Sequence, residues 1–322
     1  MASLLSVENL QVQFQTKKGI NTAVDGVSFS VEKGRILGIV GESGCGKSVT
    51  SMSILQLLGS NARISGGSIK LDGKELIGLP EKEMCRIRGN DIAMIFQDPM
   101  TALNPTLTIG TQLMEPIMLH QNCGKKEAWT RAVDVLKRVW IAAPEKRMKE
   151  YPHQLSGGMR QRVMIAMAVS CEPRLLIADE PTTALDVTIQ AQILELMCEL
   201  REKMGTAIML ITHDMGVVAE TADDVLVLYA GKAVEYGSIE DIFERPKHPY
   251  TQGLLNSIPR LDEDVELLNT IEGTVPAPDA MPAGCRFAPR CPYGKDRCMK
   301  EKPGVYHAGN SLVSCFRYEG EK

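Results

Sequence analysis

The sequence has no hydrophobic run that could cross a membrane and no excess of basic residues. A membrane-spanning helix takes roughly 18 or more consecutive apolar residues, and no stretch approaches that length. Lys and Arg number 36 against 40 Asp and Glu, so the basic face typical of a nucleic-acid binder is lacking. The start, MASLLSVENLQVQ, has no basic segment, apolar block or cleavage site of a signal peptide. We therefore expect a soluble, cytoplasmic protein with no nucleic-acid partner.

The composition is that of a chain with a large core. It has 322 residues, of which 44% are hydrophobic, enough for one large domain or two smaller ones. The nine cysteines are not expected to form disulfides in a reducing cytoplasm. Their role has to be sought in packing, reactivity or metal binding.

A glycine-rich loop, GESGCGKS, matches the phosphate-loop pattern GxxxxGK[ST]. The apolar run 36–40 before it predicts a buried strand, and spaced apolar residues over 49–58 predict a helix. In this setting the backbone N–H groups converge on phosphates at a helix N-terminus. Lys47 would reach the β- and γ-phosphates, and Ser48 would bind Mg²⁺. The predicted ATP-binding residues are Gly41, Glu42, Ser43, Gly44, Cys45, Gly46, Lys47, Ser48 and Val49.

Two carboxylates follow another apolar run, 175–178. A buried strand that ends there would place Asp179 and Glu180 at the carboxyl edge of the sheet, where ligands of open α/β sheets bind. Asp179 would orient Mg²⁺. Glu180 would polarise the attacking water as a general base.

Two more apolar runs end near polar side chains. Residues 207–211 precede His213, and residues 92–96 precede Gln97. Both runs predict strands of the same sheet, so these side chains would face the same phosphate group. We expect His213 to contact the γ-phosphate and Gln97 to take part in catalysis and in holding Mg²⁺ together with Ser48 and Asp179.

The stretch LSGGMRQR, which begins at Leu155, predicts a second anion site. Ser156 and two glycines open a helix that is expected to run to about Ser170, so free N–H groups point outward from its positive end. The stretch resembles the signature motif of ATP-binding-cassette (ABC) ATPases. In that family the motif caps ATP held by a second subunit. The residues concerned are Leu155, Ser156, Gly157, Gly158 and Met159.

Other motifs of the ABC family lie in the expected order, and the resemblance covers about residues 4–258. It implies that Phe14 stacks on adenine, that Gln97 belongs to the Q-loop and His213 is the switch histidine, and that Ala184-Leu185-Asp186 form the D-loop. The implied fold is α/β, a phosphate-loop sheet core with a helical subdomain inserted at 98–170. The implied ATPase domain is 1–258, and it needs ATP, Mg²⁺ and a second cassette.

Two further stretches, QDPMTALNPTLTIG and ERPKHPYTQGLLNSIP, resemble ATPases of dipeptide and oligopeptide importers. The resemblance implies a peripheral subunit on the cytoplasmic face of the membrane. It would work with two membrane permease subunits, a related but different ATPase chain and, indirectly, a solute-binding protein. Importers of nickel or other small solutes in the same group share the KHPYTQ segment. A soluble ABC ATPase outside transport is the remaining alternative, disfavoured by a compact helical subdomain.

A cysteine quartet characterises the C-terminal extension, 259–322. Cys285, Cys291, Cys298 and Cys315 follow an acidic, then proline-rich, linker. Disulfides are disfavoured by the compartment, and zinc sites usually contain closely spaced cysteine pairs that are lacking here. Unrelated thiols and zinc stay open as alternatives. Wide spacing favours a [4Fe–4S] cluster, which the resemblance to the peptide-importer group also implies. Because the cassette motifs all lie upstream, we expect ATP binding to be independent of this extension.

Overall fold

The computed structural model describes residues 3–17, 19–183, 186–257, 270–277 and 280–320. Within these ranges an eight-stranded sheet has the order β11-β12-β10-β9-β3-β8-β7-β6. Its parallel strands are β3 (Ile36–Val40), β6 (Ile92–Ile95), β7 (Leu175–Asp179), β8 (Ala207–Ile211) and β9 (Asp224–Tyr229). The apolar runs that predicted strands at 36–40, 92–96, 175–178 and 207–211 are thereby confirmed.

The parallel strands are buried on both faces, which explains why they are apolar throughout. Successive side chains of a strand point to opposite faces. In β3, Ile36 and Val40 belong to one hydrophobic core, and Leu37 and Ile39 belong to a second. The first core is completed by helices, and the second by an antiparallel sheet packed against the other face.

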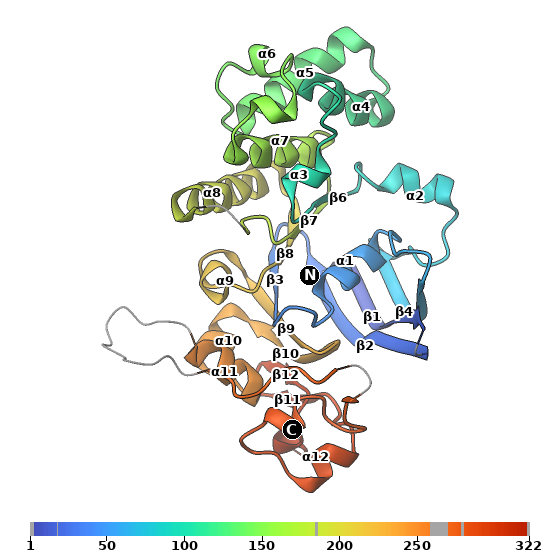
Figure 1. Ribbon diagram of the computed structural model, residues 1–322, viewed down its shortest axis with the longest axis vertical. Helices are drawn as coiled ribbons and strands as arrows, with labels where there is room; N and C mark the ends of the chain where they lie inside the picture. Colours follow the sequence, from blue (N-terminus) through green and yellow to red (C-terminus); the bar gives the residue numbers. More distant parts are fainter. Residues whose placement is uncertain (1–2, 18, 184–185, 258–269, 278–279, 321–322) are drawn as a thin grey trace.

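The antiparallel sheet lies beside the phosphate-loop helix α1 (Lys47–Ile54) (Figure 1). Within the described residues its order is β2-β1-β4-β5. The strands are β1 (Ser3–Thr16), β2 (Gly19–Glu32), β4 (Ala62–Leu71) and β5 (Lys74–Glu75), followed by α2 (Glu81–Ile87). The sequence analysis did not identify this sheet, because its half-buried strands mix apolar and polar residues.

A helical part occupies one end of the molecule (Figure 1). It contains α3 (Pro99–Ala102), α4 (Ile109–Gln121), α5 (Lys125–Arg138), α6 (Pro144–Arg147), the 3₁₀ turn Pro152–Gln154 and α7 (Gly157–Val169). Side-chain caps begin two of these helices, since Thr108 accepts from the N–H of Thr111 and Ser156 from that of Met159. These elements occupy the region predicted to be the helical subdomain.

The chain then returns to the sheet core. The elements are α8 (Val187–Met204), α9 (Met215–Thr221), β10 (Lys232–Ser238), α10 (Ile239–Glu244) and α11 (Pro249–Asn256). None of the helices in the described ranges combines the length and apolar character that a membrane crossing requires.

The C-terminal extension continues the main sheet at the opposite end from the helical part (Figure 1). Its elements are the 3₁₀ turn Ala288–Arg290, α12 (Asp296–Lys300), β11 (Tyr306–Ala308), β12 (Ser311–Val313) and the 3₁₀ turn Phe316–Tyr318. Strand β12 pairs antiparallel with β10. The buried ring of Phe287 packs on Tyr229 and Tyr250, with ring centroids 5.1 and 5.4 Å apart. The extension thus shares both a sheet and a core with the cassette.

Candidate ATP site

The phosphate loop connects the carboxyl end of β3 to α1, as the sequence predicts. Gly41 and Gly46 have φ angles of 150° and 103°. A Cβ atom on Gly41 would lie 2.1 Å from the carbonyl oxygen of Leu228, and one on Gly46 would lie 3.0 Å from that of Ala23. Both positions therefore require glycine. A glycine-rich loop between a strand and a helix is the setting in which backbone N–H groups can surround a phosphate.

Lys47 folds across this loop. Its ammonium group donates to the carbonyl oxygens of Gly41 at 2.6 Å and Glu42 at 3.2 Å, and the side chain is buried. A charged group held by two carbonyl oxygens is ready to exchange them for phosphate oxygens. This arrangement supports the predicted phosphate-binding role.

Cys45 does not have the reactive environment that a helix N-terminus can give a thiol. Its side chain is 1% exposed. Burial raises the pKa of the Cys45 thiol, and the nearby Lys47 only partly opposes this effect. The side chain of Cys45 fills space beneath the loop. Only its backbone remains available for the predicted role in ATP binding.

Asp179, the last residue of β7, provides a position for a divalent cation. It is buried, and burial raises the pKa of its carboxyl group, while a hydrogen bond from Ser48 lowers it. Its Oδ1 atom has no hydrogen-bond partner in the described part of the chain. A buried oxygen without a partner is costly, and Mg²⁺ prefers oxygen ligands. The pair of Asp179 and Ser48 therefore fits the predicted Mg²⁺ ligands.

Glu180 brings together the residues predicted to be catalytic. Its carboxylate accepts from Gln97 Nε2 at 3.1 Å and from the Thr183 hydroxyl at 2.9 Å, and His213 Nδ1 lies 3.5 Å away. Glu180 has φ 48°, in the left-handed region that is unfavourable for a residue with a side chain. Strain of this kind often marks a functional position. Thr183 was not identified from the sequence; its spacing of three residues from Glu180 was the available signal.

The signature residues and the D-loop lie at helix starts. Ser156 and Gly157 are exposed at the start of α7, and Leu155 is buried. Gly158 packs on α8, where a Cβ atom would lie 3.2 Å from Ile189. The D-loop residue Asp186 caps α8 and accepts from the Ile189 N–H at 2.9 Å. Residues 184 and 185 of the predicted D-loop lie outside the described residues.

Phe14 lies near the end of β1, opposite Asn21 of β2 and Ala62 of β4. It borders a hollow of about 180 Å³ together with Gln13 and Arg63, among others. A half-buried aromatic ring beside an open hollow is suitable for stacking. Its contact with adenine stays a prediction.

The four tail cysteines lie near one another without forming a site for a single metal ion. Burial, together with the nearby Cys315 and Cys291, raises the pKa of Cys285 to about 11. Cys298 and Cys315 likewise raise the pKa of Cys291, which burial has already raised. Among the residues described, however, no three His, Cys, Asp or Glu side chains are arranged to hold a metal ion. The geometry therefore supports neither zinc nor a cluster by itself.

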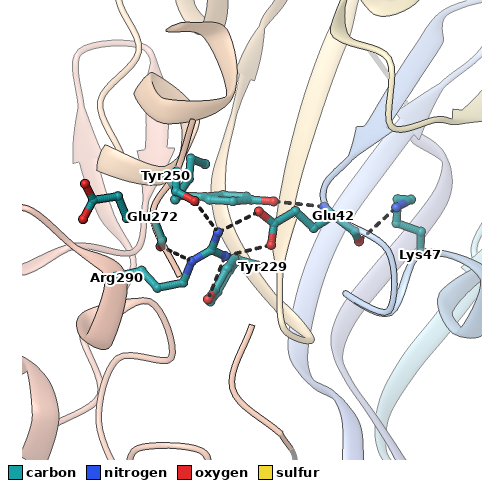
Figure 2. A network of polar contacts seen from close by, with 7 residues as sticks. Glu42, Lys47, Tyr229, Tyr250, Glu272 and Arg290 are labelled. Carbon is teal, nitrogen blue, oxygen red and sulfur yellow. Dashed lines mark hydrogen bonds and ion pairs between the residues drawn. The ribbon is translucent and has the colours of Figure 1, made fainter. Parts of the chain in front are cut away.

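Two residues near the loop were not predicted to contact it. The Tyr250 hydroxyl accepts the N–H of Glu42 at 2.9 Å, and Arg290 of the C-terminal extension pairs with the Glu42 carboxylate (Figure 2). From the sequence, the segment HPY served only to indicate the resemblance to importer ATPases. His248 caps α11 and is fully buried, which lowers its pKa to about 3, so the ring is neutral.

Known proteins match both parts of the chain. Residues 24–183 match the family model described as ABC transporter, and residues 234–298 match that described as oligopeptide/dipeptide transporter, C-terminal region. The chain is 56% identical to the oligopeptide transport ATP-binding protein AppD of Bacillus subtilis, over 100% of this chain and 98% of that protein. It is 52% identical to OppD of Escherichia coli, over 98% and 93%.

A solved structure shares the architecture of the cassette. It is a dimeric, post-hydrolysis state of the ATP-binding cassette MJ0796 bound to ADP and Pi. It is 27% identical, with a TM-score of 0.66, and the match covers 73% of this chain and 98% of that one. The phosphate loop, the carboxylates after β7 and the helix start at Ser156 thus lie within a fold of known type. The chain belongs to the ABC transporter ATP-binding proteins, in the group that carries the oligopeptide/dipeptide transporter C-terminal region.

Proposed function

We propose that this chain hydrolyses ATP to energise the uptake of peptides through separate membrane permease subunits. The observation that carries the proposal is the convergence of Gln97, Thr183 and His213 on Glu180 at the carboxyl edge of the sheet. The names of the relatives, which are oligopeptide and dipeptide transport ATP-binding proteins, support peptides as the transported solute.

In this proposal different residues of the chain bind the phosphates, accept the proton from water and hold Mg²⁺. Lys47 and the loop N–H groups bind the phosphates, and Glu180 accepts a proton from the attacking water. His213 and Gln97 orient the reactants around Glu180. Ser48, Asp179 and Gln97 would hold Mg²⁺, which neutralises charge on the phosphate oxygens when bound. In the described structure Gln97 faces Glu180, so its part in holding Mg²⁺ rests on the family resemblance.

Hydrolysis would take place between two cassettes arranged head to tail. The exposed start of α7 offers N–H groups and a positive helix end with no phosphate of its own chain to bind. It would cap the γ-phosphate held by a partner cassette, a related but different chain.

Ser156→Arg should abolish hydrolysis in the assembled pair of cassettes while leaving the affinity of the isolated chain for ATP within about twofold, because the motif serves the partner's ATP. Nucleotide titration of the isolated chain and phosphate release from the assembly measure the two effects. Ser65→Arg, on an exposed part of β4, is the matched control. A sharp loss of affinity in the isolated Ser156→Arg chain would contradict the composite site.

The permease would dock beside the Q-loop. A groove of about 390 Å³ lies between the helical part and the sheet, and its lining includes Phe96, Leu119 and Met164. Phe96 and Leu119 are large exposed apolar side chains, and Phe96 precedes Gln97. An apolar groove adjoining a catalytic side chain is a suitable contact for a partner that must sense ATP. In this proposal the chain is a peripheral subunit on the cytoplasmic face of the membrane.

Co-purification tests this assignment. Purification of the tagged chain with its natural partners should recover two permease subunits and a second ATPase chain. Recovery of a soluble macromolecular assembly without membrane subunits would instead favour the non-transport alternative. A complex that binds nickel or another small solute, and not peptides, would favour the other importers of the group.

We also propose that the tail cysteines hold a [4Fe–4S] cluster. Besides burial, Cys315 and Cys291 raise the pKa of Cys285, Cys315 and Cys298 raise that of Cys291, and Cys298 raises that of Cys315, so the four thiols lie in one neighbourhood. Their wide spacing along the sequence suits an iron–sulfur cluster better than a structural zinc site, which usually contains closely spaced cysteine pairs.

Protein purified without oxygen should be brown and contain about four iron and four sulfide ions per chain. Replacing Cys291 with Ser should remove the colour, whereas Cys85→Ser, which changes an exposed cysteine of α2, should not. Anaerobic metal analysis and the visible absorption spectrum are the measurements. Zinc without iron, or no metal at all, would contradict the cluster.

A further inference from the structure

An arginine of the C-terminal extension is bonded directly to the phosphate loop (Figure 2). Arg290, which precedes Cys291, donates from Nη1 to Glu42 Oε2 at 2.8 Å and from Nη2 to Oε1 at 3.1 Å. Two parallel bonds of this kind are stronger and more directional than a single ion pair. The Arg290 side chain is only 6% exposed, so solvent screens the pair weakly.

The guanidinium of Arg290 is held in place from several sides. Its Nε donates to the carbonyl oxygen of Glu272 at 3.0 Å, and Nη2 donates to that of Ile271 at 3.2 Å. Nη1 also lies 3.4 Å from the Tyr229 hydroxyl. The group cannot turn away from Glu42 without losing these bonds, so its position is fixed by the fold.

Glu42 is in turn connected to the nucleotide-binding lysine. Its N–H donates to the Tyr250 hydroxyl at 2.9 Å, and its carbonyl oxygen accepts from Lys47 at 3.2 Å (Figure 2). Glu42 therefore contacts Arg290 through its side chain and Lys47 through its backbone.

A second arginine beside a cysteine reaches the same loop by another route. Arg286, which follows Cys285, donates to the carbonyl oxygen of Ala230 and to Asp25 Oδ2, the latter at 3.1 Å. Gly231 follows Ala230 in the chain, and its N–H donates to the carbonyl oxygen of Cys45, in the phosphate loop, at 2.8 Å. The segment between the two cysteines thus contacts the phosphate loop directly through Arg290 and indirectly, by way of residues 230–231, through Arg286.

The charge of Glu42 explains why Arg290 matters. A phosphate loop has to attract a polyanion, and a carboxylate within the loop opposes that attraction. We propose that Arg290 is a positioning residue of the ATP site: it neutralises Glu42, fixes the loop and so makes nucleotide binding depend on the C-terminal extension. This inference rests on the proposed ATPase function. It replaces the expectation that ATP binding is independent of the extension.

Steady-state ATPase kinetics of the assembled complex test the inference. Arg290→Ala should raise the KM for ATP about tenfold and change kcat less than about twofold, because phosphate binding is weakened equally in ground and transition states. In the Glu42→Gln background, which has no charge to neutralise, Arg290→Ala should change KM less than about twofold. Arg297→Ala is the matched control, since Arg297 forms its ion pairs with Glu301 and Glu319, which both belong to the extension.

An unchanged KM in Arg290→Ala would overturn the inference, and so would a tenfold effect that persists in the Glu42→Gln background. Arg290→Met keeps the buried aliphatic stem and replaces Arg290→Ala in each comparison if thermal melting shows that the alanine variant does not fold. Failure of this inference can be distinguished from failure of the proposed ATPase function. If Lys47→Ala weakens nucleotide binding while Arg290→Ala leaves KM unchanged, the ATP site stands and only the role of Arg290 fails.

Discussion

Glu180→Gln should lower kcat for ATP hydrolysis by about 10²–10⁴-fold while ATP binding is retained, since removal of a general base typically has an effect of this size. Glutamine keeps the length of the side chain and can still contact Gln97 and Thr183, so the site stays assembled. What is lost is the carboxylate that takes the proton from water. Because ATP would persist between the two cassettes, the variant should also accumulate as a closed pair.

Phosphate release and equilibrium nucleotide binding measure the two halves of this prediction. Glu172→Gln is the matched control, because Glu172 pairs with Arg138 on the surface of the helical part. Phosphate release by Glu180→Gln at close to the wild-type rate would show that another group is the base. His213, 3.5 Å from Glu180, would then be the next residue to test.

Lys47→Ala should weaken ATP binding about 10- to 100-fold, because a charge-assisted hydrogen bond contributes about 1.5–3 kcal/mol. In the structure the ammonium group is buried and bonded to the carbonyl oxygens of Gly41 and Glu42. ATP therefore has to replace these two bonds with stronger ones to its phosphates.

A nucleotide titration of the folded chain measures this effect. Lys146→Ala is the matched control, since the side chain of Lys146 is 71% exposed in the helical part. Unchanged affinity in Lys47→Ala would contradict the assignment of the loop. Equal losses in both variants would indicate a general effect of charge rather than a phosphate contact.

Local sequence patterns predicted the elements that hold the ATP site. Buried parallel strands are continuous apolar runs, so β3 and β8 could be bounded to the residue. The glycines of the loop and the serine cap of α7 are equally local signals. Asp179, Glu180 and His213 each lie at or just after the end of a predicted strand. Their positions therefore indicated that they would meet at one edge of the sheet.

Contacts between distant segments could not be predicted in this way. Glu42 and Arg290 are separated by 248 positions, and no pattern at either residue indicates the other. The pairing of β12 with β10 is hidden for the same reason, because β12 is only three residues long. Burial is hidden from a local motif as well: Cys45 lies in the loop before a helix, yet it is buried, and burial raises the pKa of its thiol.

The most direct test is peptide uptake by the complete transporter, reconstituted into lipid vesicles with ATP on the side of the cassettes. Labelled dipeptides and oligopeptides should accumulate only when ATP and Mg²⁺ are supplied, and a complex that carries Glu180→Gln should fail to accumulate them. Equal uptake without ATP, or full uptake by the Glu180→Gln complex, would contradict the account of this chain as the ATP-hydrolysing subunit of a peptide importer.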